Sequence, residues 1–263
     1  MKSLLFKVSS LLLCLNVFAG NSIYITQVGT SDNLTLDILQ DGDDNEVRLS
    51  VSHDNNTIDI DQEGDDNTIS WVSYWGSGQN WGGDLDGSNN TLKFEQFNTT
   101  GTDENVIGFH IPTSDNTIHV CQGKTFDNAA DTTCTSTTSS EYGGHTANID
   151  IHGGSTTLRG SQETGTGNAD HYARVYTWNG TGNDIFFKQS GNGDKWLQLI
   201  VRTHNGEQEV IQAGNGEHTA TIDLTGSYTT DLSLTQNSSS DKTYTLTNNC
   251  QTSSGCSVTV TQN

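Results

Sequence analysis

The chain has 263 residues, of which 31% are hydrophobic and 16% are charged. Its formal net charge of −21 argues against nucleic acid as a partner, because phosphates are bound by lysine and arginine. The apolar residues are patterned and aromatic residues reach 8%, which argues against a disordered acidic tail.

The first residues, 1–19, read as a secretory signal peptide. Two lysines supply a positive end, and residues 8–18 form an apolar run that is too short to span a bilayer. We expect cleavage after Ala19, because the cysteine in this run follows a leucine and fits a lipidated site poorly. The secreted part, 20–263, then has nine basic and 32 acidic residues and a net charge of 9 − 32 = −23. No other apolar run approaches membrane length, so we expect no membrane insertion.

A short repeat follows the leader and recurs along the chain. Its pattern is Asn-x-apolar-x-apolar-x-Gln, which occurs at residues 21–27, 56–62, 90–96, 116–122 and 183–189. Two more copies, 230–236 and 256–262, change only the first residue. Looser copies begin at Asn33, which leads to Gln40, and at Asn67. Neighbouring starts are often 11 or 12 residues apart, which is the length of one strand and one turn.

The spacing places the amides and the apolar residues of each copy on one face, because side chains alternate along a strand. A glycine often lies two residues beyond the glutamine and provides a backbone conformation that other residues resist. We therefore assign turn roles to Gly29, Gly42, Gly64, Gly191 and Gly214.

These units predict an all-β fold, a two-sheet parallel β-solenoid of stacked strand–turn–strand rungs. No apolar stripe with helical spacing competes, and β-branched residues crowd the strands. In-register stacking would join like amides into hydrogen-bonded ladders along the stack. The residues expected in these ladders are Asn21, Gln27, Asn33, Gln40, Asn56, Gln62, Asn67, Asn90, Gln96, Asn116, Gln122, Asn183, Gln189, Gln236 and Gln262.

Three stretches, at residues 72–89, 123–147 and 163–170, interrupt the repeat. We expect them to form loops that project from the stack. Four cysteines remain after the leader. They are even in number, close in sequence and follow an export signal, which favours disulfides. Of the three possible connectivities, Cys121–Cys134 with Cys250–Cys256 is the natural one.

The repeat resembles that of the curlin family, the secreted subunits of curli-type amyloid fibres on bacterial surfaces. The family repeat is Ser or Asn, five residues, Gln-x-Gly, two residues, and then Asn with a second strand. Residues 21–33 and 56–67 fit this form closely, and 183–191 fit its first half. The resemblance covers most of the secreted part, more loosely in 97–180.

The resemblance implies an extracellular, cell-surface fibre subunit for adhesion and biofilm matrix, which polymerises with itself. It also implies two partners, a nucleator subunit and an outer-membrane secretion pore. This chain is longer and more acidic than the familiar major subunits and has loops and cysteines, which leaves open a minor or specialised role. The repeats run from Asn21 to Gln262 without a capping segment, which favours head-to-tail polymerisation.

Other functions stay open on sequence alone. A monomeric secreted solenoid could bind carbohydrate or ice through outward threonine rows at 219–221, 243–247 and 259–261, or through Trp75 and Trp81. Acidic turns such as 41–44 could bind calcium, but none completes a twelve-residue calcium loop. No G-x-S-x-G or H-E-x-x-H motif occurs, so we expect no enzyme, no cofactor and no metal site.

Overall fold

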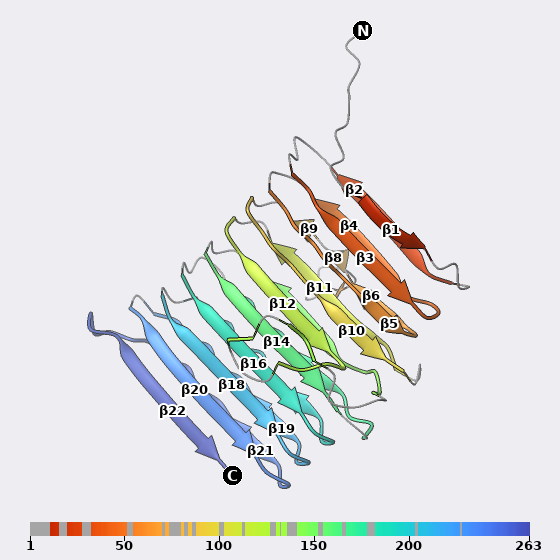
Figure 1. Cartoon of the computed structure of the whole chain (residues 1–263). Coiled ribbons are helices and arrows are strands. Elements are labelled where there is room, and N and C mark those ends of the chain that lie inside the picture. Colours follow the sequence, from red (N-terminus) through yellow and green to blue (C-terminus); the bar gives the residue numbers. More distant parts are fainter. Residues whose placement is uncertain are drawn as a thin grey trace.

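The computed structural model of the chain shows two long parallel β-sheets that face each other across one core (Figure 1). It describes residues 11–15, 20–27, 33–51, 55–69, 72–73, 80–81, 84–85, 88–99, 103–111, 114–126, 130–131, 133–135, 141–151, 155–164, 167–177, 182–202, 205–226 and 228–263. These residues contain no helix, and so none that could cross a membrane. The predicted all-β, two-sheet β-solenoid is confirmed.

Successive strands of the chain alternate between the two sheets. Sheet A contains β1 (Leu11–Leu15), β3 (Leu36–Asp41), β5 (Gln62–Gly64), β10 (Glu95–Asn98), β12 (Thr117–Gln122), β14 (Thr157–Glu163), β16 (Asp184–Ser190), β18 (Glu207–Ala213), β20 (Thr230–Asn237) and β22 (Cys256–Gln262). Sheet B contains β2 (Ser22–Gln27), β4 (Glu46–Val51), β6 (Asn67–Ile69), β11 (Asn105–Ile111), β13 (Thr146–Asp150), β15 (His171–Ala173), β17 (Lys195–Trp196), β19 (His218–Ala220) and β21 (Lys242–Tyr244).

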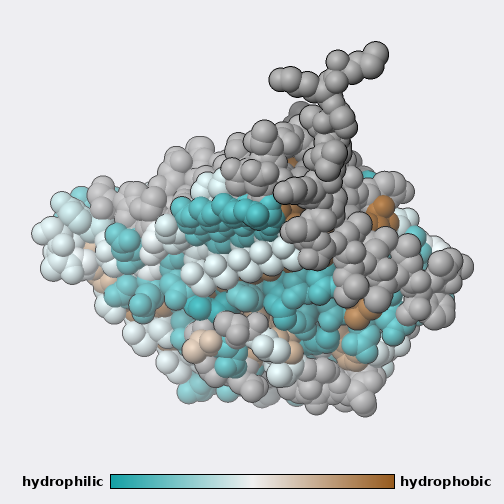
Figure 2. Space-filling view, turned by 45° about the horizontal axis from the view of Figure 1, so that its top comes forward, coloured by the Kyte–Doolittle hydropathy of each residue, from teal (hydrophilic) through white to brown (hydrophobic). Residues whose placement is uncertain are grey.

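The core lies between the sheets and follows from the two-residue period of the repeat. Along β3, buried and exposed residues alternate without a break. The inward positions hold leucine, isoleucine, valine and a few aromatics, such as Phe94, whose ring stacks on that of Phe109 at a centroid distance of 5.0 Å. Outside the core, the coloured part of the visible face is mostly hydrophilic or intermediate in hydropathy, with a few hydrophobic patches (Figure 2).

One core position shows how neighbouring rungs fit together. Gly160 on β14 lies opposite Phe187 on β16, and a Cβ atom on Gly160 would come within 2.1 Å of the Phe187 ring. The larger side chain therefore fills the space that the glycine leaves. Such pairing of small and large residues maintains the dense packing of a protein interior.

The expected leader takes part in the stack in this structure of the whole chain. β1, which lies within residues 1–19, pairs in parallel with β3, and Leu15 lies opposite Gln40. Cleavage after Ala19 stays a prediction.

The three expected loops have different forms. Within 72–89, β7 (Val72–Ser73) and β8 (Asn80–Trp81) form an antiparallel pair, and β9 (Asp84–Leu85) joins sheet B beside β4 and β11. The segment 123–147 extends into a strand at its end, because β13 begins at Thr146. Residues 163–170 begin at the end of β14 and lead to β15.

Candidate functional site

A single row of glutamines runs from rung to rung across sheet A, near the ends of its strands. Each Nε2 donates to the Oε1 of the glutamine in the next rung, at 2.6–2.9 Å. The row consists of Gln40, Gln62, Gln96, Gln122, Gln162, Gln189, Gln212, Gln236 and Gln262. The sequence analysis named all of these except Gln162 and Gln212.

The same amides also join the two sheets. Gln122 Nε2 donates to the backbone carbonyls of Val106 and His145 in sheet B, both at 3.0 Å. Gln96 does the same with Thr68 and Asn105. From Gln62 onward, the glutamines therefore stabilise both the stacking of rungs and the connection between sheet A and sheet B.

Buried asparagines occupy two other positions of the rung. At the start of the sheet A segments lie Asn56, Asn90, Asn116 and Asn183, and Asn116 Nδ2 donates to Asn90 Oδ1 at 3.2 Å. At the start of the sheet B strands, Asn67 donates to Asn45 at 2.9 Å and Asn105 to Asn67 at 3.1 Å. These bonds run from the later rung to the earlier one, opposite to the glutamine row.

Asn21 begins the row of sheet B asparagines: it precedes β2, its Oδ1 accepts from the Asn45 backbone amide, and its Nδ2 donates to the Gly42 carbonyl, both at 2.8 Å. Three other residues of the expected ladders depart from this arrangement. Asn183 lies in register between Thr156 and Gly206, which carry no side-chain amide. Gln27 belongs to sheet B and lies opposite Val51, which carries no amide. The first repeat copy therefore belongs to sheet B, where it pairs with β4. Asn33 lies in an exposed row instead, in which its Nδ2 donates to Asn55 Oδ1 at 2.8 Å.

The turn glycines are required by backbone geometry. Gly42, Gly64, Gly191 and Gly214 all have positive φ, between 87° and 127°. A Cβ atom on Gly64 would lie 1.7 Å from the carbonyl oxygen of Asn98 in the next rung. Gly29 lies outside the described residues.

In the second half of sheet B, basic residues replace the asparagines. His145, His171, Lys195, His218 and Lys242 follow Asn105 in the same register position. Three of them, His171, Lys195 and His218, contact turn carbonyls as the asparagines do; Lys195 Nζ donates to those of Gly193, Gly214 and Gly216. Burial lowers the pKa of Lys195 to about 8, because desolvation outweighs the nearby carboxylates.

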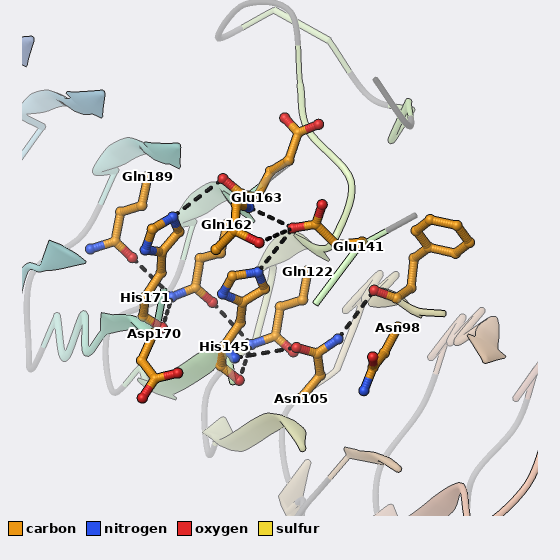
Figure 3. A network of polar contacts seen from close by, with 12 residues as sticks. Asn98, Asn105, Gln122, Glu141, His145, Gln162, Glu163, Asp170, His171 and Gln189 are labelled. Carbon is orange, nitrogen blue, oxygen red and sulfur yellow. Dashed lines mark hydrogen bonds and ion pairs between the residues drawn. The ribbon is translucent and has the colours of Figure 1, made fainter. Parts of the chain in front are cut away.

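A buried glutamate connects this basic column with the loop before β13 (Figure 3). Glu141 Oε1 lies 3.3 Å from His145 Nε2 and accepts hydrogen bonds from the Thr164 amide and hydroxyl. The rings of His145 and His171 stack at 5.0 Å. Burial lowers the pKa of His145 to about 3, and burial together with neighbouring cations holds the pKa of His171 well below its usual value.

Both predicted disulfides are present. Cys121–Cys134 anchors a segment that crosses the outer face of sheet A (Figure 1), where the buried Phe126 packs with Phe186. Cys250–Cys256 closes a turn directly before β22.

The edge of β22 that faces away from β20 is unpaired among the described residues. Val258 and Val260, which point toward the core, are only partly buried, whereas Leu232 and Leu234 opposite them on β20 are buried. Gln262 accepts from Gln236 at 2.8 Å, but its own Nε2 reaches only the Thr243 carbonyl at 3.5 Å. The apolar core and the amide row both continue up to this edge.

The described residues include no group of three or more His, Cys, Asp or Glu side chains that could hold a metal ion. The acidic turns instead bond between rungs, as where the Asp43 amide donates to Asp65 Oδ1 at 2.8 Å. Comparison of the chain with protein-family models, with curated proteins and with solved structures gives no match in any of the three.

Proposed function

We propose that this chain is the structural subunit of a secreted, curli-like amyloid fibre that assembles head to tail at the cell surface for adhesion and biofilm matrix. The observation that carries the proposal is the open edge of β22, beside which no further strand pairs among the described residues and at which Val258, Val260 and Gln262 are only partly buried. Unpaired strand edges of this kind are templates for pairing with another chain.

The opposite end offers a matching position. Cleavage after Ala19 would remove β1 and leave β3 at the end of sheet A. A neighbouring β22 could then pair with β3, with Gln262 opposite Gln40. The polarity fits, because Gln262 would donate to Gln40 as every earlier glutamine in the row donates to the next. Such a heterologous contact does not close and so forms a filament.

The resemblance to curlin repeats supports the same function. It adds the nucleator subunit and the outer-membrane secretion pore as proposed partners. The alternative is a monomeric secreted solenoid that binds carbohydrate or ice.

The test transfers purified residues 20–263 from denaturant to buffer at micromolar concentration, followed by electron microscopy and fibre diffraction. We expect filaments with reflections near 4.7 and 10 Å, the strand and sheet spacings of cross-β structure. A lasting monomer with native strand content would contradict the proposal.

A pair of variants on β22 makes the test specific for the edge. Val260→Lys places a charge on the inward face that a neighbouring subunit would cover, and we expect it to abolish elongation. Thr259→Lys places the same charge on the outward, exposed face of the same strand and serves as the control. Equal filament growth by both variants would show that this edge is not the growing surface.

A further inference from the structure

A pair of stacked aromatic rings stands on the outer face of sheet B. Tyr172 on β15 and Trp196 on β17 are direct register partners. Their ring centroids lie 4.3 Å apart and their planes are within 6° of parallel. Trp196 is 41% exposed, so the stack keeps much of its apolar surface open to solvent.

The open surface is one face of the indole. Neighbouring strands lie about 4.8 Å apart, so parallel rings with a 4.3 Å centroid distance stack from strand to strand. One face of Trp196 is therefore covered by Tyr172. The other faces β19, where the register partner is Thr219, a residue too small to cover a ring. A flat group placed above Thr219 would continue the stack.

Polar side chains border this place on both sides. Two residues further along each strand lie Arg174, Gln198 and Thr221, which are partly exposed. Their sequence neighbours, such as Leu197 and Leu199 on either side of Gln198, are buried in the core, so the three side chains face outward. Two residues before Trp196 and Thr219 lie the exposed Asp194 and Glu217. The Arg174 guanidinium lies 5.9 Å from the Tyr176 ring, in the rung of β15, two strands away from Thr219.

The chemistry of this surface selects the ligand. A flat apolar face with amide and hydroxyl groups beside it matches a sugar ring, which has an apolar C–H face and a rim of hydroxyls. On the other side of Trp196 and Thr219, the carboxylates of Asp194 and Glu217 would repel an anionic ligand. The net charge of −21 disfavours anionic ligands and a second acidic copy laid against this face.

We propose that Trp196, Thr219, Gln198 and Thr221 form a binding subsite for a pyranose unit of a neutral polysaccharide. The ring lies against the free face of Trp196 above Thr219, and Gln198 and Thr221 bond to its hydroxyls. A single open platform of this kind gives weak binding, with a Kd of about 1 mM for a short oligosaccharide. The site lies on the side of the stack, away from β22, and does not depend on polymerisation.

The test is saturation-transfer NMR with the full-length chain and three neutral probes: the hexasaccharides of cellulose, chitin and starch. We expect transfer to the ring C–H protons of at least one probe. Trp196→Ala should reduce the signal at least tenfold. Thr219→Arg should do the same for a different reason, because its long side chain lies over the free indole face and occupies the place of the sugar.

Tyr228→Ala is the matched control, since Tyr228 is a similarly exposed aromatic residue (39%) that lies between β19 and β20. It should leave the signal unchanged, and circular dichroism checks that every variant keeps its strands. Absence of transfer for all three probes, or transfer that persists in Trp196→Ala and Thr219→Arg, would overturn the proposal. Equal loss in Tyr228→Ala would overturn it as well, because the contact would then not be specific to this face.

Discussion

The side-chain amide of Gln122 donates to Gln162 over 2.9 Å, although forty residues separate the two in sequence. Gln122 is fully buried and also holds two carbonyls of sheet B. Replacing it by leucine, which has similar size, would leave Gln162 Oε1 without its donor and would take one hydrogen bond from each of the two carbonyls, although the His145 carbonyl still accepts from the Val106 amide. We expect Gln122→Leu to lower the free energy of unfolding by about 3 kcal/mol, since each buried unmet group costs about 1–3 kcal/mol. Urea denaturation measures the change.

The end of the row supplies the control for that prediction. Gln262→Leu removes an amide that is partly exposed, and Gln236 keeps its bonds to the carbonyls of Thr219 and Lys242. We expect a change below about 1 kcal/mol. Equal effects of the two substitutions would mean that burial of the row contributes nothing to its stability.

Gly64→Ala should destabilise the chain far more than Gly255→Ala. Both glycines have nearly the same positive φ, 89° and 86°, so both substitutions bear a similar backbone strain of about 1–2 kcal/mol. Only at Gly64 would the new Cβ collide with backbone, at 1.7 Å from the Asn98 oxygen, whereas at Gly255 the nearest atom is 3.4 Å away. Thermal unfolding of the two variants separates the collision from the strain, and similar melting temperatures would contradict the role of close rung stacking.

Acid should weaken the fold through the buried histidines. The pKa of His145 falls to about 3 in the folded chain from about 6.5 when unfolded, so below pH 6.5 the unfolded state binds more protons. This contribution to stability is complete above pH 6.5 and is lost as the pH falls toward 3, by about 1.4 kcal/mol per pH unit. The lowered pKa of His171 acts in the same direction.

The variant that tests this prediction introduces asparagine, the residue that occupies the same column at Asn105. His145→Asn with His171→Asn should flatten the pH dependence of the urea midpoint between pH 6.5 and 4.5. At pH 8 the slopes of parent and variant should agree, because both histidines are then neutral in either state. A parent slope that the double substitution leaves unchanged would show that other groups cause the acid sensitivity.

The two disulfides should differ in their rate of reduction. Cys121 and Cys134 are both buried, whereas Cys256 is partly exposed. A reducing thiolate must reach a sulfur atom, so under native conditions Cys250–Cys256 should open at least tenfold faster. Alkylation followed by peptide mass spectrometry measures both rates. In denaturant the difference should vanish, and its persistence there would exclude burial as the cause.

The strand period and the glutamine positions were predictable because they depend on local spacing. Gln162 was not predicted as a ladder residue because the inward position two residues before it is Gly160, which breaks the apolar pattern. Only the packing of Phe187 in three dimensions explains that glycine. Gln212 was not predicted as a ladder residue either, because its repeat copy contains Gln208, a buried amide at a position that elsewhere is apolar.

The basic column and the aromatic pair could not be predicted, because they depend on the register between rungs, which a single sequence does not give. His145 follows Asn105 by forty residues, and the insertion between them conceals that both hold the same place in the rung. Likewise, 24 residues separate Tyr172 from Trp196, and neither belongs to a recognisable motif. The sheet to which the first repeat belongs was also ambiguous, because both sheets begin a strand with asparagine.

The uniform direction of the glutamine row gives the stack an electrical polarity. Each amide in the row directs its carbonyl toward the first rung and its N–H toward the last, so their dipoles add as peptide dipoles do along an α-helix. The short asparagine rows oppose only a part of this sum. The end at β22 therefore carries partial positive charge and the end at Gln40 partial negative charge. Between two stacks that approach end to end, this polarity favours the orientation that brings β22 to the Gln40 end over the reverse one, before any strand has paired.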